Sequence, residues 1–236
     1  MSTQQKVVIV TGASQGIGEA LVGAYRERSY RVVATSRSIK QGGDMDVLAV
    51  AGDVGDPATA ERVVKEAVSR FGRIDTLVNN DGIFIAKPFT DYTIDDFKAK
   101  ISTNLAGFFH ITQRAVAQML KQGSGHIVNI TTSLTDHAVA SVPAALAILT
   151  KGGLNSVTKA LAIEYAAKGI RVNAVSPGII KTPMYRPEAY ESLAALHPMK
   201  RMGEISDIVE AVLYLESAGF VTGEILDVDG GQSAGH

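Results

Sequence analysis

Short apolar runs rich in β-branched residues alternate along this chain with longer segments of helical periodicity. "KVVIV" at residues 6–10 is typical of the short runs, and "IGEALVGAYRERS" at 17–29 is typical of the longer segments. Strands of this kind between helices usually pair in parallel and are buried on both faces of the sheet. Right-handed crossovers then predict a Rossmann-like, doubly wound parallel α/β sheet of about seven strands, with helices on both faces.

The same pattern covers the whole length of 236 residues, without an internal repeat or a linker-like tract. We therefore expect residues 1–236 to form a single dinucleotide-binding and catalytic domain. The expected strands are residues 6–10, 31–36, 46–54, 74–80, 125–133, 170–178 and 223–231. The expected helices are residues 17–29, 58–72, 94–123, 143–168 and 204–217.

Composition excludes several classes of site. The net charge is −1 and like charges form no block, so nothing supports a nucleic-acid or membrane-surface partner. The chain has no cysteine, and its five histidines are scattered without ligand spacing, so we expect no metal site. The apolar run near the first residue is too short for a signal peptide or a membrane span. We expect a cytoplasmic protein.

The stretch "TGASQGIG" at 11–18 directly follows the first expected strand and opens a helix. Glycines there let the backbone turn tightly and approach a pyrophosphate, while the helix N-terminus offers free N–H groups. The alternative is a glycine-rich turn without a ligand, because short glycine patterns recur by chance. The residues predicted to bind the cofactor are Gly12, Ser14, Gln15, Gly16, Ile17 and Gly18.

The second expected strand ends in "ATSRS", which places Ser36 and Arg37 where the two dinucleotide cofactors are distinguished. NAD-binding proteins usually carry an acidic residue there, whereas an arginine accommodates the 2′-phosphate of NADP. A guanidinium can donate two charge-assisted hydrogen bonds to that phosphate. NADP(H) is therefore favoured over NAD(H), although Arg37 could also be a solvated loop residue.

Several further motifs occur in order: "GDV" at 52–54, "VNNDG" at 78–82, Asn104, "KGGL" at 151–154 and "NAVSPG" at 173–178. With "TGASQGIG" and "VTGEILDVDGG" at 221–231, they make the chain resemble the short-chain dehydrogenase/reductase family over essentially its whole length. The resemblance implies an oxidoreductase with a small-molecule substrate. It also implies cofactor contacts at Asp53, Val54, Asn80, Gly82, Lys151, Pro177, Gly178, Ile180 and Thr182.

In the resembling family a tyrosine protonates the substrate oxygen, a lysine four residues later lowers the tyrosine pKa, a serine polarises the carbonyl, and an asparagine holds a water. Residues i and i+4 lie on one face of a helix, so the tyrosine and the lysine meet the same ligand. Lys151 and Asn104 match this pattern, but Ala147 stands at the tyrosine position. The predicted catalytic residues are therefore Asn104, Ser133 and Lys151.

Two other positions depart from the family. The usual serine spacing falls on Leu134, and a difference of one residue in the loop would bring in Ser133, which we favour over Thr132. Asp81 stands where the family normally has alanine. A laboratory substitution could explain Ala147 but not these further departures, which favours natural divergence.

Loss of one placed general acid costs about 10²–10⁴-fold in rate, which handicaps the reduction of an ordinary ketone. An iminium ion already carries its charge, and a quinone gives a stable phenolate, so substrates of these kinds are favoured. His137, Tyr185, Tyr190 and Lys151 are the candidate replacement donors. The alternative function is a catalytically silent NADP(H)-binding protein that acts as a sensor or a structural subunit.

Helices 102–120 and 143–166 are apolar over much of their surface. Such surfaces are usually buried against another packed element or another protein chain. In the resembling family, a second subunit covers them. We expect a homotetramer or a dimer, with a monomer as the alternative. Residues 184–199 correspond to the family's mobile substrate lid, and their sequence does not reveal the substrate.

Overall fold

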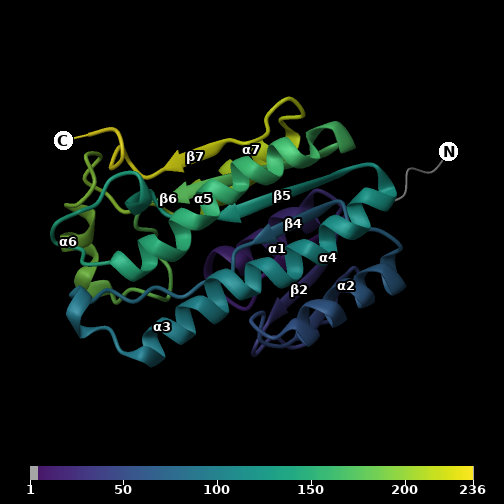
Figure 1. The fold of residues 1–236 in the computed structure, drawn as a ribbon, viewed down its shortest axis with the longest axis horizontal. Helices are drawn as coiled ribbons and strands as arrows, with labels where there is room; N and C mark the ends of the chain where they lie inside the picture. Colours follow the sequence, from purple (N-terminus) through teal and green to yellow (C-terminus); the bar gives the residue numbers. More distant parts are fainter. Residues whose placement is uncertain (1–4, 236) are drawn as a thin grey trace.

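The computed structural model describes residues 5–235, and within that range seven parallel strands form a sheet with the order β3-β2-β1-β4-β5-β6-β7 (Figure 1). The strands are β1 (Val7–Thr11), β2 (Arg31–Ser36), β3 (Val47–Ala51), β4 (Thr76–Asn79), β5 (Gly125–Ile130), β6 (Ile170–Pro177) and β7 (Ile225–Val228). The helices are α1 (Gly16–Glu27), α2 (Pro57–Phe71), α3 (Ile94–Lys100), α4 (Gly107–Gln122), α5 (Ala145–Tyr165), α6 (Tyr190–Ala194) and α7 (Ile205–Ser217).

The strand order reverses next to β1. The chain winds outward from β1 through β2 to β3, returns to β4 on the other side of β1, and then winds outward to β7. This topology confirms the predicted Rossmann-like fold. In such sheets ligands bind in the crevice outside the carboxyl ends of the strands where the order reverses, here between β1 and β4.

Each face of the sheet has its own hydrophobic core, and β1 contributes to both. Val7 and Ile9 pack on the face that α2, α4 and α5 cover, whereas Val8 and Val10 pack on the face that α1 and α7 cover (Figure 1). Side chains alternate between the faces of a strand, so a strand covered on both sides needs an apolar residue at every position. This is why "KVVIV" shows no polar alternation.

The helix predicted at residues 94–123 is in fact three joined segments. A π-helix, Ile101–Ala106, separates α3 from α4. The wider turn carries Asn104, whose amide is held by Ile83 and Thr150. Because a single π-turn covers only a few residues, a periodicity read over a longer window does not reveal it.

The other boundaries differ at the strand ends and in the lid region. The third expected strand, 46–54, is paired only over Val47–Ala51, and the last, 223–231, only over Ile225–Val228. The flanking residues form turns, which the apolar pattern does not exclude. Helix α6 lies inside the lid region, where the sequence predicted no element.

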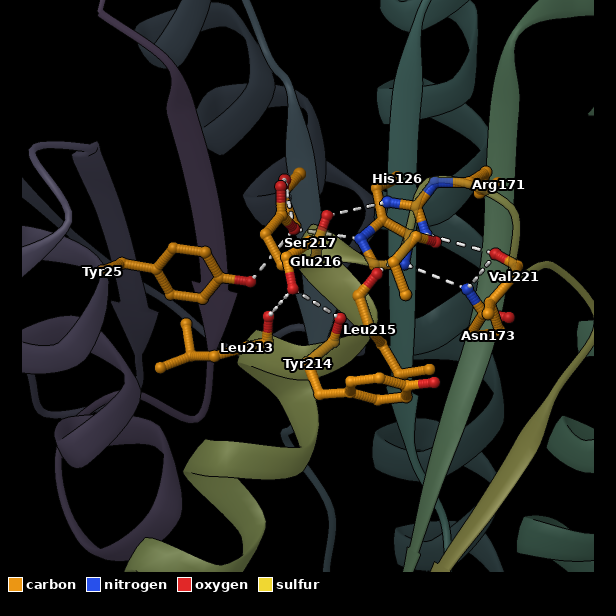
Figure 2. Close-up of polar contacts among 12 residues, drawn as sticks. Tyr25, His126, Arg171, Asn173, Leu213, Tyr214, Leu215, Glu216, Ser217 and Val221 are labelled. Carbon is orange, nitrogen blue, oxygen red and sulfur yellow. Dashed lines mark hydrogen bonds and ion pairs between the residues drawn. The ribbon is translucent and has the colours of Figure 1, made fainter.

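A buried carboxylate joins several elements at the amino ends of the strands. Glu216, near the end of α7, accepts hydrogen bonds from four side chains of other elements. Figure 2 shows this carboxylate with Tyr25 and His126 turned toward it. The donors are the hydroxyls of Tyr25, Tyr30 and Thr76, at 3.3, 2.9 and 3.0 Å, and Nδ1 of His126, at 2.9 Å.

The neighbours of His126 determine its tautomer. Asn173 Oδ1 accepts from the backbone N–H of Glu224, so its Nδ2 faces His126 Nε2 at 3.2 Å as a donor. Nε2 therefore accepts, Nδ1 carries the proton toward Glu216, and the imidazole is neutral. Burial also lowers the pKa of His126. Burial raises the pKa of Glu216, but hydrogen bonds, first that from His126, outweigh this and hold it at about 2.

We expect Glu216→Gln to lower the free energy of unfolding at pH 7 by about 3 kcal/mol, because an amide cannot accept from all four donors. The carboxylate's contribution is complete above the usual pKa of 4.5 and is lost as the pH falls from 4.5 toward 2. Urea unfolding from pH 3 to pH 8 measures both effects, with the exposed Glu210→Gln of the same helix as control. Identical acid dependence in the two variants would contradict this assignment.

Candidate active site

The predicted glycine turn closes over the carboxyl end of β1. Gly12 and Gly16 adopt φ values of +64° and +60°, in the left-handed region that favours glycine. A Cβ on Gly18 would overlap the carbonyl oxygen of Gly12, so only glycine lets α1 begin so close to the strand. Gln15 precedes the helix without a side-chain cap. The first N–H groups of α1 therefore remain available to an anion.

The end of β2 contributes a polar group without a partner. Ser36 is buried and its hydroxyl forms no hydrogen bond, while Arg37 beside it is exposed. Asp53 is exposed and accepts from the backbone N–H of Gly55 at 2.9 Å. Val54 is buried at the same edge. These four residues lie where the sequence predicted the adenosine end of a cofactor.

Thr11 connects the glycine turn to the segment after β4. Its Oγ1 accepts from the backbone N–H groups of Asn80 and Asp81 at 3.0 and 2.9 Å. The Asn80 side chain donates back to the carbonyl oxygens of Thr11 and Gly12 at 2.9 and 3.2 Å. The backbone around Asp81 is thereby fixed against the glycine turn.

The carboxyl group of Asp81 lies among charges from both ends of the site. Burial raises its pKa, Arg37 and Lys151 act in the opposite direction, and Asp53 adds to the rise. Because Arg37 and Lys151 both influence it, Asp81 stands between the predicted phosphate-binding and catalytic groups.

Lys151 lies on α5 and points back toward the sheet. Its Nζ donates to the carbonyl oxygen of Ile130 at 2.7 Å. A Cβ on Gly82 would lie 3.0 Å from the same Nζ, so the absence of a side chain there leaves room for the ammonium. Burial lowers the pKa of Lys151 to about 8, against the opposing effect of Asp81.

Asn104 is buried close to this ammonium and is fully engaged. Its Oδ1 accepts from the N–H of Ile83 at 3.0 Å, and its Nδ2 donates to the carbonyl oxygen of Ile83 and to Thr150 at 3.3 and 3.1 Å. The site of a Cβ on Gly82 lies 3.5 Å from Asn104 Oδ1. The structure thus brings Asn104, Gly82 and Lys151 together.

The predicted serine and tyrosine positions form an apolar surface. Leu134 and Ala147 are both buried in one hydrophobic cluster, against which Phe84, Val139 and Ile148 pack. Ser133 is also buried, but its hydroxyl donates to Gln232 Oε1 at 2.8 Å. The carbonyl-polarising role of Ser133 stays a prediction, because this hydrogen bond occupies its proton.

The segment after β6 holds the remaining predicted contacts. Thr182 lies 3.7 Å from the site of a Cβ on Gly16, so this segment faces the glycine turn. Pro177 and Ile180 are buried, and Gly178 lies against His197, which accepts from the N–H of Ile179 at 3.0 Å. A cavity of about 310 Å³ adjoins it, lined by residues that include Gly178, Ile180, His197, Arg201, Asp207 and Asp229.

The candidate replacement donors differ in their surroundings. Burial raises the pKa of Tyr185, which makes it a weaker acid. Tyr190 begins α6 in the lid region, and His137 follows the short helix that contains Ser133. Their roles as proton donors stay predictions.

Gln232 and Lys100 are among the buried polar residues near the site that sequence reasoning missed. Gln232 is 1% exposed, and its Nε2 has no partner. Lys100 is completely buried and precedes the π-helix that carries Asn104. Spacing could have indicated Lys100, which lies four residues before Asn104, whereas nothing local indicates Gln232. Residues 5–235 contain neither a group of His, Asp and Glu suited to a metal ion nor a helix able to cross a bilayer.

Comparison with known proteins agrees with this geometry. A family model described as enoyl-(acyl carrier protein) reductase matches residues 12–233. An uncharacterized oxidoreductase of Thermotoga maritima is 35% identical over 253 residues, covering 99% of this chain and 100% of the relative. A 3-oxoacyl-(acyl-carrier-protein) reductase of Staphylococcus aureus is 34% identical over 241 residues, covering 96% of this chain and 97% of the relative.

Solved structures show the same relationship. ElxO with NADP bound matches with a TM-score of 0.91 at 31% identity, covering 98% of this chain and 100% of that one. The 3-ketoacyl-(acyl-carrier-protein) reductase from Brucella melitensis complexed with NADH gives a TM-score of 0.90 at 31% identity, with the same coverage. The chain belongs to the short-chain dehydrogenase/reductase family of oxidoreductases.

For this short-chain dehydrogenase/reductase we expect Asn104→Ala to lower the free energy of unfolding by about 3 kcal/mol, because buried groups of Ile83 and Thr150 lose their partner. Asn155→Ala is the matched control, since Asn155 makes one side-chain bond, to Thr135, and should cost about 1 kcal/mol. Urea unfolding compares the two. Equal costs would show that Asn104 does not organise the segment around Ile83.

Proposed function

We propose that this chain is an NADP(H)-dependent oxidoreductase that reduces a small organic carbonyl, quinone or imine without a tyrosine acid. Residues 1–236 would act as one domain. The observation that carries the proposal is the assembly of Asn104, Gly82 and Lys151 at the strand ends, next to the apolar surface of Leu134 and Ala147. A protein that only bound a nucleotide would need the glycine turn but not this assembly.

The residues present fit NADP(H). Gly12, Gly16 and Gly18 form a turn into which side chains would not fit, and the first N–H groups of α1 are suited to a pyrophosphate. The unpartnered Ser36 hydroxyl and the exposed Arg37 are suited to a 2′-phosphate. ElxO and the Brucella reductase, which hold NADP and NADH, support a dinucleotide of this kind. NAD(H) is the less favoured alternative.

The further contacts are those that the family resemblance implies. Asp53 and Val54 would contact the adenine, Asn80 the ribose side, and Lys151 the nicotinamide ribose. Pro177, Gly178, Ile180 and Thr182 would line the nicotinamide. When bound, NADPH supplies the hydride, and the chain's own residues hold the substrate against it and exclude water.

The substrate class follows from the missing hydroxyl. By family resemblance Leu134 and Ala147 occupy the serine and tyrosine positions, and both are apolar and buried. An apolar surface does not stabilise the oxyanion that forms when a ketone is reduced. An iminium ion becomes neutral on reduction, and a quinone gives a stabilised phenolate. These substrates need less help from a tyrosine.

We expect the unchanged protein to consume NADPH with a cyclic imine or a quinone more readily than with a matched ketone. Ala147→Tyr should raise ketone reduction by about 100-fold, since one placed general acid contributes about 10²–10⁴. Steady-state assays compare these two proteins with Ala145→Tyr, an exposed control on the same helix. Calorimetry first establishes that all three proteins bind NADP⁺.

The outcomes separate the two candidate functions. If the unchanged protein binds NADP⁺ but is inert throughout, while Ala147→Tyr reduces ketones, the chain is a catalytically silent NADP(H)-binding protein. The burial of both Leu134 and Ala147 in apolar packing is what favours this second candidate. Equal turnover of ketones and imines by the unchanged protein would refute the proposed substrate class.

We expect Asp81→Asn to tighten NADP⁺ binding at pH 7 by about tenfold, because it removes a carboxylate from the binding site of an anion. The pKa of Asp81 is raised by burial. In the unchanged protein, NADP⁺ affinity should therefore rise as the pH falls and the carboxyl is protonated. Calorimetry measures the NADP⁺ affinity of the unchanged protein and of Asp81→Asn from pH 5 to pH 8. The cofactor's own titration is the same in both proteins, so it cancels in the difference between their affinities. The exposed Asp91→Asn is the control, and identical pH dependence in all three proteins would contradict a role for Asp81.

Assembly and location stay predictions. Exposed Phe109 and Leu120 on α4 and Leu149 and Ile163 on α5 support a homotetramer or dimer through these helices. A cytoplasmic location rests on composition alone.

A further inference from the structure

Lys100, the last residue of α3, carries a buried charge that the proposed function does not yet use. Its side chain is 0% exposed, and it forms no ion pair with a carboxylate within residues 5–235. Its Nζ donates to the carbonyl oxygen of Ile83 at 2.6 Å and lies 5.3 Å from the centroid of the Phe84 ring. Lysine is almost never fully buried unless it is paired, because an unpaired ammonium is costly to remove from water.

The position of Lys100 connects it to the catalytic assembly. Lys100 and Asn104 both donate to the carbonyl oxygen of Ile83, at 2.6 and 3.3 Å. Ile83 directly follows Gly82, whose Cβ site is 3.0 Å from Lys151 Nζ. One short stretch of backbone therefore links both ammonium groups and the amide.

The charged groups around this stretch have unequal effects on the two lysines. Burial, with the nearby charge of Lys151, lowers the pKa of Lys100 to about 8. Burial also lowers the pKa of Lys151 to about 8, but Asp81 opposes that change. Asp81 favours the charged form of Lys151 and has no such effect on Lys100. The two lysines thus reach about the same pKa, and Lys100 is the one on which no carboxylate acts.

Phe84 separates Lys100 from the apolar surface. Its ring lies over the Lys100 ammonium and also packs against the cluster that contains Leu134 and Ala147. This ring keeps the ammonium from direct contact with a substrate at Ala147. The polar group that Lys100 contacts is the carbonyl oxygen of Ile83, which it shares with Asn104.

We propose that Lys100 is the proton source of this site and compensates for the hydroxyl that Ala147 lacks. The inference rests on the proposed function. In the reduction of a C=O or C=N bond, the carbon takes a hydride from NADPH, which becomes NADP⁺. In a ketone or a neutral imine, the oxygen or nitrogen then takes a proton through water at the Asn104–Lys151 edge, and Lys100 replaces that proton; an iminium ion takes none. The neutral amine of Lys100 is then reprotonated from solvent. Lys100 thus acts through other groups rather than by touching the substrate.

The first test measures the titration of Lys100 without turnover. Protein labelled with carbon-13 at lysine Cε is titrated by NMR with NADP⁺ bound, and the Lys100 signal is the one absent from Lys100→Met. We expect that signal to titrate near pH 8. Titration at the ordinary lysine pKa of about 10.4 would overturn the proposal, because Lys100 would then release no proton near neutral pH.

The second test separates a proton source from a structural charge. Lys100→Arg keeps the cation, but its proton does not leave in the working pH range. For a ketone or a neutral imine that is turned over, we expect kcat to fall by about 100-fold in both Lys100→Arg and Lys100→Met, with NADP⁺ affinity and thermal stability of Lys100→Arg unchanged. We also expect kcat of the unchanged protein to fall above pH 8, and this fall should be absent from both variants. Lys98→Met, at an exposed position of the same helix, is the control.

Two failures can be distinguished. If the unchanged protein turns over a substrate and Lys100→Arg retains its kcat and its pH profile, Lys100 is structural and only this inference fails. If the unchanged protein binds NADP⁺ but reduces no ketone, quinone or imine, the proposed function fails and the inference fails with it.

Discussion

The hydrogen bonds of Thr11 hold together the two halves of the sheet where the functional side chains meet. Thr11 ends β1, and the residues that donate to its hydroxyl follow β4, 69 and 70 positions further along the chain. Because β1 and β4 are adjacent at the reversal of strand order, one threonine fixes the glycine turn against Asp81. Gly82, the next residue, lies against Lys151. The relative placement of the glycine turn and Lys151 therefore depends on the hydrogen bonds of Thr11, together with those that the Asn80 side chain donates to Thr11 and Gly12.

The fold could be predicted because its cause is local and repeated. Every buried strand needs a continuous apolar run, and every crossover needs a helix with an apolar face. The glycines of the turn could be predicted for the same reason, because positive φ at Gly12 and Gly16 is a property of the residue itself. The π-helix could not be predicted, because it is a single turn inside a longer helix and the apolar periodicity is read over many more residues.

The surroundings of the site depend on contacts between distant residues, which a pattern of spacing does not contain. The family's serine spacing, counted from the tyrosine position at Ala147, favours Ser133, yet the hydroxyl of Ser133 is held by Gln232, 99 residues away. Leu134 and Ala147 are visible in the sequence as separate departures from the family, but only the fold shows that they share one cluster. Lys100 reads as the polar residue of an amphipathic helix, and its burial comes from the loop around Ile83 and Phe84.

A proton donor near neutral pH can be obtained by more than one physical route. In the resembling family a lysine charge lowers the pKa of a phenol. Here burial lowers the pKa of Lys100 and Lys151 to about 8. Removal from water thus brings a pKa closer to neutral, as a neighbouring charge does in the family. The apolar cluster around Ala147 is then part of the chemistry, because Phe84 both packs against it and covers Lys100.

The carboxylate of Glu216 has a consequence for how this protein can evolve. It joins α7 to three strands of the sheet or their immediate approaches, through Tyr30, Thr76 and His126, at the edge opposite the glycine turn. These stabilising hydrogen bonds of the fold thus lie away from the carboxyl ends of the strands. Substitutions at those ends leave that anchor untouched, so mutation and selection can exchange the hydroxyls of the site for apolar or charged side chains without unfolding the scaffold.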